Sequence, residues 1–182
     1  MLDADPAFSG NTSAILRVPT RLAEVSAASD DSAGTTYSGT GSPPGPTLPF
    51  DDTTPDIAEV IAPAVMSATI RPKIPRGRIH FSAVIDYASI SSADVVALAV
   101  FYTIGGGADV FAGIGVARLT SGANSGGEIV ASGWIDHAED DLDQDFVFSA
   151  YIGLADPAKT LTIESRFGTV PTLRVWERPA SL

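Results

Sequence analysis

The feature that most limits how this chain can fold is a series of short apolar segments that starts after residue 62. Residues that favour turns, chiefly Gly, Pro, Ser and Asp, separate the segments, and none of them shows a helical period. Eight strands are therefore predicted, at Val65–Ile70, Arg78–Tyr87, Val95–Ile104, Val110–Leu119, Glu128–His137, Asp145–Leu154, Thr160–Phe167 and Leu173–Glu177. Short strands at such regular spacing are typical of an antiparallel sandwich or barrel.

Alternation within the segments predicts which side of each strand faces the core, because successive side chains of a strand point to opposite faces. One face of the second segment carries Ile79, Phe81, Ala83, Ile85 and Tyr87. The other face carries His80, Ser82 and Asp86. The segment Val95–Tyr102 breaks the pattern because it is apolar on both faces. Either a partner subunit or the N-terminal arm covers its outer face, or the small residues Ala97 and Ala99 are exposed.

Residues 1–62 have a different composition from the rest of the chain. Ser32–Pro55 holds four Gly and five Pro residues, so we expect it to form neither a helix nor a strand ladder. We therefore predict three parts, namely an N-terminal anchoring arm (1–31), a Pro/Gly/Ser-rich linker (32–62) and a β-sandwich domain (63–182). Apolar residues of the arm are expected to dock on a partner by strand addition or groove binding. These partner-binding residues are Ile15, Leu16, Val18, Leu22 and Val25.

Composition excludes several classes of function. The net charge of −11 argues against binding nucleic acid through its phosphates. The chain has no Cys and only two His, which excludes a disulfide framework, thiolate zinc sites and His-rich metal centres, so no metal or cofactor is expected. The longest apolar run has eight residues, against roughly 20 for a membrane span, and the first residues lack the features of a signal peptide. We therefore expect a protein that is used without export and without a membrane.

Two charged clusters and one glycine run have the residue types of binding sites, but each also has a simpler structural interpretation. An acidic cluster has the spacing of a calcium loop: Asp141, Asp143 and Asp145. The Gly and Glu that complete an EF-hand are missing, which favours a solvated turn. A basic cluster could bind an anion or a polysaccharide, although pairing with neighbouring acids is preferred: Arg71, Lys73, Arg76 and Arg78. Gly105–Gly107 lacks the helix and the Lys of a phosphate-binding loop and is interpreted as a hairpin turn.

The two histidines do not form a convincing catalytic site. His80 has Ser82 and Asp86 nearby, but the chain contains no nucleophile elbow, so a surface location is preferred for His80 and for His137. A carboxylate pair could serve as a glycosidase acid and base, although nothing positions it: Asp136 and Glu139. Three aromatic residues could stack on sugar rings or, more commonly, close the core or fill an interface: Trp134, Tyr151 and Trp176.

The order of elements near the C-terminus is similar to that of a known family. A strand ends in Trp134-Ile135-Asp136 and is followed by an acidic turn, the aromatic strand Phe146–Tyr151 and the closing strand Leu173–Glu177. Over about residues 63–182 this order resembles the tumour-necrosis-factor/C1q-like jelly rolls of bacteriophage virion proteins, such as head fibres, decoration proteins and tail-appendage heads. The resemblance implies a jelly roll that forms a homotrimer and an N-terminal segment that anchors the protein to the particle.

These observations favour a non-enzymatic structural protein of a phage virion, of the capsid-decoration or head-fibre type. In this interpretation an extended, Pro/Gly-rich N-terminal arm attaches an all-β, jelly-roll-like sandwich to a capsid or tail protein. The alternative is a tail-fibre or receptor-binding module that recognises host surface glycans through Trp134 or Trp176. An esterase-like or glycosidase enzyme is the third interpretation and is not favoured.

Overall fold

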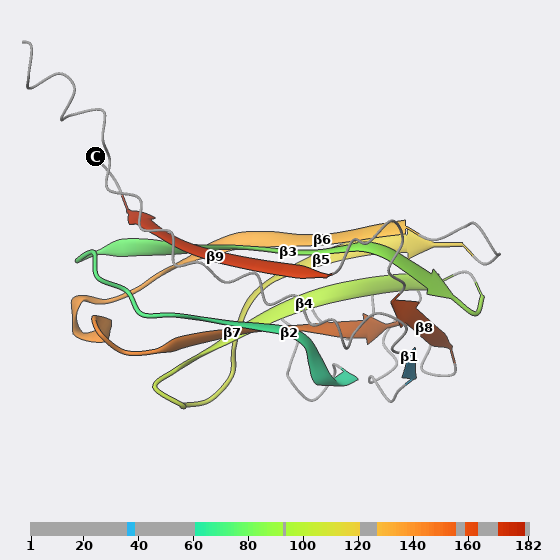
Figure 1. The fold of residues 1–182 in the computed structure, drawn as a ribbon, viewed down its shortest axis with the longest axis horizontal. Coiled ribbons are helices and arrows are strands. Elements are labelled where there is room, and N and C mark those ends of the chain that lie inside the picture. The colour runs from blue at the N-terminus through green and yellow to red at the C-terminus, as the bar shows by residue number, and fades with distance from the viewer. Residues whose placement is uncertain are drawn as a thin grey trace, which may run out of the picture.

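The structure is a computed structural model that describes residues 36–38, 61–92, 94–120, 127–155, 159–163 and 171–180. Its strands are β1 (Thr36–Ser38), β2 (Ile61–Ile70), β3 (Gly77–Ile90), β4 (Asp94–Ile104), β5 (Val110–Leu119), β6 (Gly127–Asp136), β7 (Phe146–Leu154), β8 (Thr160–Ile163) and β9 (Thr172–Pro179). A single turn of 3-10 helix, η3 (Glu139–Asp141), lies between β6 and β7. The strands form two layers, with β3, β6 and β9 above β2, β4 and β7 in Figure 1. In this part of the chain no helix is long and apolar enough to cross a membrane.

The strand pairing identifies the architecture. β1 pairs with β8, β2 with β7, β3 with β6 and β4 with β5, all antiparallel. These four pairs form one long two-stranded ribbon. Two further pairings, β3 with β8 and β4 with β7, join the pairs of the folded ribbon into two sheets. Their strand orders, β1-β8-β3-β6 and β2-β7-β4-β5, are those of a jelly roll. The expected all-β, jelly-roll-like sandwich is therefore confirmed.

The eighth strand of this jelly roll is divided in two. β8 pairs with Ala88–Ile90 of β3, whereas β9 pairs with Gly77–Val84 along the same strand. β3 therefore holds β6 on one side and the successive strands β8 and β9 on the other. This arrangement places the outward side chains of β6, β3 and β9 next to one another.

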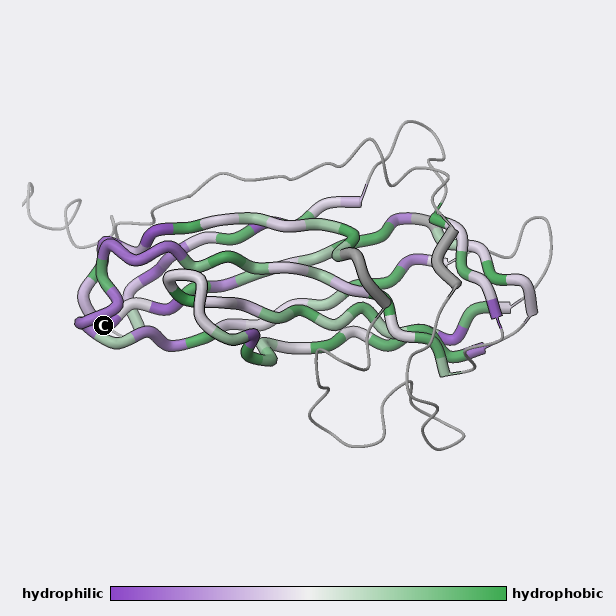
Figure 2. The backbone as a smooth tube through the Cα atoms, turned by 90° about the horizontal axis from the view of Figure 1, so that it is seen from below, coloured by the Kyte–Doolittle hydropathy of each residue, from purple (hydrophilic) through white to green (hydrophobic). Residues whose placement is uncertain are grey.

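The core lies between the two sheets and is formed by the faces that alternation predicts. Four inward residues of β3 are each 0% exposed: Ile79, Phe81, Ala83 and Ile85. Phe81 meets Phe148 of the opposite sheet at a ring-centroid distance of 5.8 Å. The alternation then shifts, because the register changes after Ile85 and Ala88 is the next buried residue; the side chain of Tyr87 lies outside the described residues. Hydrophobic residues follow the strands, and hydrophilic ones gather at one end of the sandwich (Figure 2).

Glycines let the two sheets approach each other along the edge formed by β5 and β6. Gly115 pairs with the inward Leu98, and a Cβ at Gly115 would overlap the carbonyl oxygen of Val130 on β6. A Cβ at Gly113 or at Gly133 would lie 2.9 Å from the tip of the Phe81 ring. β5 therefore has glycine at the positions where the backbone of β6 and the ring of Phe81 come closest.

Thr36–Ser38 corrects one expectation about the N-terminal part. These residues form β1 and pair with β8, so the prediction that Ser32–Pro55 contains no ladder is wrong at this point. The prolines of the segment begin only at Pro43, and Thr36 and Tyr37 are of residue types that favour strands. The partner-binding candidates lie outside the described residues, so the anchoring arm stays a prediction: Ile15, Leu16, Val18, Leu22 and Val25.

The hairpin predicted at Gly105–Gly107 is confirmed. Gly105 and Gly106 have φ values of 56° and 79°, and the Gly107 N–H donates to the Ile104 carbonyl oxygen at 2.9 Å. Positive φ at both central residues is the mark of the type I′ turn, which glycine adopts without strain. The turn joins β4 to β5.

Candidate functional site

An aromatic row crosses the outer face of the sheet that contains β3, β6 and β9. His80 on β3 lies opposite Trp134 on β6 and opposite Trp176 on β9. The His80 ring stacks on Trp176 at a centroid distance of 5.5 Å and an interplanar angle of 13°, and lies 6.4 Å from Trp134. The strand register thus joins three residues that are far apart in the sequence into one surface. We call Trp134, His80 and Trp176 the aromatic row.

Trp134 is the most accessible member of the row. Its exposed fraction is 55%, whereas His80 and Trp176 are half-buried. The indole nitrogen of Trp176 is buried and has no hydrogen-bond partner among the described residues. A buried donor without a partner costs about 1–3 kcal/mol, so the N–H of Trp176 does not stabilise the fold. What Trp176 offers to this surface is its ring. The row therefore offers flat apolar rings at the protein surface.

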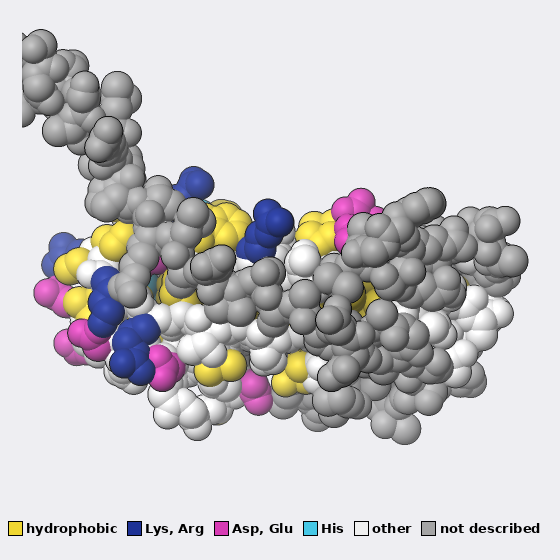
Figure 3. Space-filling model, viewed as in Figure 1, with side chains coloured by type: hydrophobic (Ala, Val, Ile, Leu, Met, Phe, Trp, Pro, Cys, Tyr) yellow, Lys and Arg dark blue, Asp and Glu magenta, His cyan; other side chains and the backbone are white. Residues whose placement is uncertain are grey.

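Arginine side chains surround the aromatic row. The Arg78 guanidinium lies 5.5 Å from the centroid of the Trp134 ring, and its Nε donates to Asp136 Oδ1 at 2.7 Å. Arg174 and Arg178 are exposed and lie two residues before and two residues after the tryptophan of β9. Neither of them forms an ion pair within the described part of the chain. Figure 3 shows Lys and Arg side chains next to hydrophobic ones along the upper edge, where these strands run.

The charge around the row is opposite to that of the whole protein. Arg78, Arg174 and Arg178 carry three positive charges and Asp136 carries one negative charge, which gives a local net charge of +2. The whole chain carries −11. Burial, and then the charges of Arg178 and Arg78, lower the pKa of His80 below its ordinary value of 6.5. His80 is therefore neutral at pH 7, which leaves the positive charge of this surface to the arginines.

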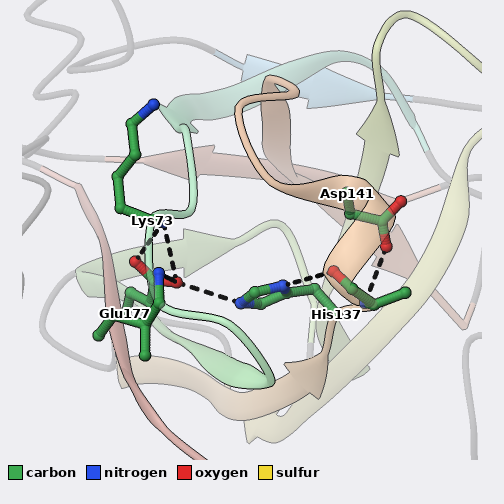
Figure 4. A network of polar contacts seen from close by, with 6 residues as sticks. Lys73, His137, Asp141 and Glu177 are labelled. Carbon is green, nitrogen blue, oxygen red and sulfur yellow. Dashed lines mark hydrogen bonds and ion pairs between the residues drawn. The ribbon is translucent and has the colours of Figure 1, made fainter.

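A buried polar network closes the end of the sandwich beside this sheet (Figure 4). Glu177 is 0% exposed and accepts hydrogen bonds from the backbone N–H of Lys73, at 3.1 and 2.9 Å, and of Ile74, at 2.9 Å. His137 Nε2 lies 3.1 Å from Glu177 Oε1, and its Nδ1 lies 3.1 Å from the Ala138 carbonyl oxygen. β9, the β2–β3 turn and the β6–β7 turn are thereby tied together.

The buried position of His137 corrects the expectation of a surface histidine. Both of its ring nitrogens face oxygen atoms, the carboxylate of Glu177 on one side and the Ala138 carbonyl on the other. Gly77 makes room for the pair, because a Cβ there would lie 2.8 Å from His137 Nε2 and 3.0 Å from Glu177 Oε1. The filled space and the backbone donors indicate a structural role for this network.

The acidic and basic clusters pair with each other. Arg71 bonds to Asp145 at 2.7 Å, and Lys73 forms an ion pair with Asp143. The preferred interpretation of the basic cluster, pairing with neighbouring acids, is confirmed for these two residues and for Arg78. Asp141 instead accepts a hydrogen bond at 2.9 Å from the Ala138 N–H, at the start of η3. The three carboxylates therefore turn to different partners, and no group of three metal-ligating side chains occurs among the residues described.

The outer face of the other sheet carries a second apolar cluster. Ala97 and Ala99 on β4 are each 0% exposed, so the interpretation that these small residues are exposed is wrong. Larger side chains of β5 and β7 pack around them, and the Phe101 ring meets Phe111 at 5.7 Å and Tyr151 at 5.9 Å, both edge-on. Tyr151 thus lies on the opposite side of the molecule from Trp134 and Trp176, and the three aromatic candidates do not form one site.

Comparison with known proteins adds no family assignment. No family model matches this chain, and no curated protein matches it. Of the residues considered for enzyme chemistry, His80 lies between the two tryptophans and Asp136 is bound to Arg78. Sequence analysis identified Trp134 and Trp176 as aromatic candidates but missed His80 as the residue between them. The signal was present in the alternation of β3, but the pairing of β3 with β6 and β9 was needed to use it.

Proposed function

We propose that this chain is a non-enzymatic structural protein of a phage virion, of the capsid-decoration or head-fibre type. The observation that carries the proposal is the complete jelly-roll pairing, in which β1 to β4 pair with β8 to β5 in order. Jelly rolls are common in viral capsid proteins, and the fold supports the resemblance by analogy only. In this proposal residues 1–31 anchor the protein and the sandwich is displayed outward.

Association into a homotrimer forms part of the proposal. The outer face of β4 and β5 is its support, because half-buried Phe111, Ile114 and Tyr151 lie beside Val116, which is 47% exposed. Burial of such a surface against other copies of the chain would stabilise an oligomer. Val116→Asp places a charge in this surface and is expected to reduce the trimer to monomers in light scattering. Val130→Asp, at a residue 43% exposed on the other sheet, is the matched control.

The anchoring role is tested by co-sedimentation with purified particles of the phage that encodes the protein. Replacement of Ile15 and Leu16 by Asp is expected to abolish binding, whereas the same charges at Ser26 and Ser29 leave it unchanged. Undiminished binding after deletion of residues 1–30 would overturn the role of the arm. A trimer that remains intact in the deletion variant separates attachment from self-association.

A second candidate function is recognition of host surface glycans, and the aromatic row favours it. Aromatic rings at a protein surface stack on the apolar faces of sugars, and the rings of Trp134, His80 and Trp176 are neighbours here. Jelly rolls also occur among lectins. On a glycan array, Trp134→Ala is expected to abolish sugar binding, while Tyr151→Ala on the opposite face leaves it unchanged. Sugar binding that survives the loss of Trp134 would remove the row from this function.

A further inference from the structure

We infer that the outer face of β6, β3 and β9 binds a sugar that carries a negative charge, with the aromatic row under the sugar ring and the arginines of β9 on the anionic group. This inference rests on the glycan-binding function proposed above and specifies the ligand class. Two observations carry it, namely the geometry of the row and the charge of its surroundings.

The geometry sets where a ring can lie. Trp134 and Trp176 stand on either side of His80, two strand spacings apart, which is about 10 Å. Trp134 is the exposed end of the row at 55%, so a sugar ring is expected to stack there and extend over His80. A ligand of more than one sugar residue fits this length.

The charges set the sign of the ligand. Arg174, Trp176 and Arg178 occupy every second position of β9, so all three side chains lie on the outer face. Arg78 is already bound to Asp136, whereas Arg174 and Arg178 have no ion-pair partner among the described residues. An exposed guanidinium without a carboxylate offers two parallel donors to a carboxylate or a sulfate.

The negative charge of the rest of the protein limits the length of the acidic ligand that can bind. A net charge of −11 repels long polyanions at low salt, but screening beyond about 8 Å at physiological ionic strength leaves a short ligand under the local charge of +2. The row also binds through ring stacking, which salt does not screen. A short acidic oligosaccharide is therefore favoured over nucleic acid, whose binding depends on many phosphate contacts.

The experiment measures binding to the full chain by titration of tryptophan fluorescence, since Trp134 and Trp176 are the only two tryptophans. The probes are an oligogalacturonate, its carboxyl-reduced neutral counterpart, a sulfated galacto-oligosaccharide and inorganic sulfate. We expect the acidic sugars to bind at least tenfold more tightly than the neutral one, because charge-assisted hydrogen bonds are the stronger ones. The carboxylated and sulfated probes then distinguish the two sources of charge.

Variants show which arginines bind the anionic group of the sugar. Arg174→Gln and Arg178→Gln are each expected to weaken binding of the acidic sugar about tenfold or more and to leave binding of the neutral sugar unchanged. Arg118→Gln, at an exposed arginine on the other sheet, is the matched control and is expected to change neither. Equal binding of acidic and neutral sugars would overturn the ligand class and leave glycan binding standing. Binding of inorganic sulfate with no preference for any sugar would overturn both.

Discussion

Glu177 is the residue on which the end of the sandwich depends. Its carboxylate is fully buried and accepts from two backbone N–H groups and faces the His137 ring. Loss of a buried acceptor costs more than loss of an exposed ion pair, because buried donors that it served are left without a partner.

The first prediction concerns Glu177→Ala. We expect the free energy of unfolding to fall by about 3–5 kcal/mol, because the part-buried backbone donors of the β2–β3 turn and the buried His137 lose their acceptor. Asp136→Ala breaks the exposed Arg78 pair and is expected to cost less than about 1 kcal/mol. Urea unfolding of both variants measures the difference. Equal, small losses would show that the network does not hold the turns together.

The second prediction concerns the protonation of His80. Both tryptophans of the chain contact its ring, so tryptophan fluorescence is expected to change as His80 titrates, with a midpoint below 6.5. The pKa of His80 is lower in the folded than in the unfolded chain. The unfolded chain therefore binds the proton first as the pH falls, and the stability that is present above 6.5 decreases below it. His80→Gln is expected to remove the fluorescence transition, and a transition that persists would assign it to another group.

Among the elements, β5 shows how a strand sequence is shaped by a neighbour that it does not pair with. Its inward glycines lie against β6 and against Phe81, which belong to the other sheet. Gly115→Ala is predicted to lower stability by about 3 kcal/mol, since its Cβ would overlap backbone that cannot move independently. Gly127→Ala meets only the tip of Leu119, at 2.8 Å, and is expected to cost less than about 1 kcal/mol. Thermal unfolding distinguishes them, and similar melting temperatures would contradict the close approach of β5 and β6.

The strands also show what sequence reasoning could and could not reach. Alternation is local, so it correctly placed Ile79 and Phe81 in the core and His80 outside. The aromatic row is not local, because it depends on the register of three strands whose loops differ in length. The burial of Ala97 and Ala99 depends likewise on side chains of neighbouring strands. β1 was missed because the glycine and proline content around it outweighed the strand propensity of Thr36 and Tyr37.

For the whole molecule, the pairing order predicts where folding starts. Of the strand pairs in the described residues, only β4 and β5 are neighbours in sequence, and every other pair closes a longer stretch of chain. Loop-closure entropy favours the shortest connection, so the ribbon is expected to form from the turn at Gly105–Gly107 toward β1 and β8. Contacts near this turn then belong to the transition state, and contacts of β9 form later.

Two substitutions test this order. Gly106→Ala strains a residue with φ of 79° that has no atom within 4 Å of a new Cβ, so its cost of about 1–2 kcal/mol comes from the backbone alone. We expect this variant to fold more slowly with little change in its unfolding rate, because the turn is already formed in the transition state. Glu177→Ala removes contacts that form after the transition state and is expected mainly to accelerate unfolding. Stopped-flow folding and unfolding rates in urea measure both effects, and the reverse assignment would place the nucleus at the β9 end of the jelly roll.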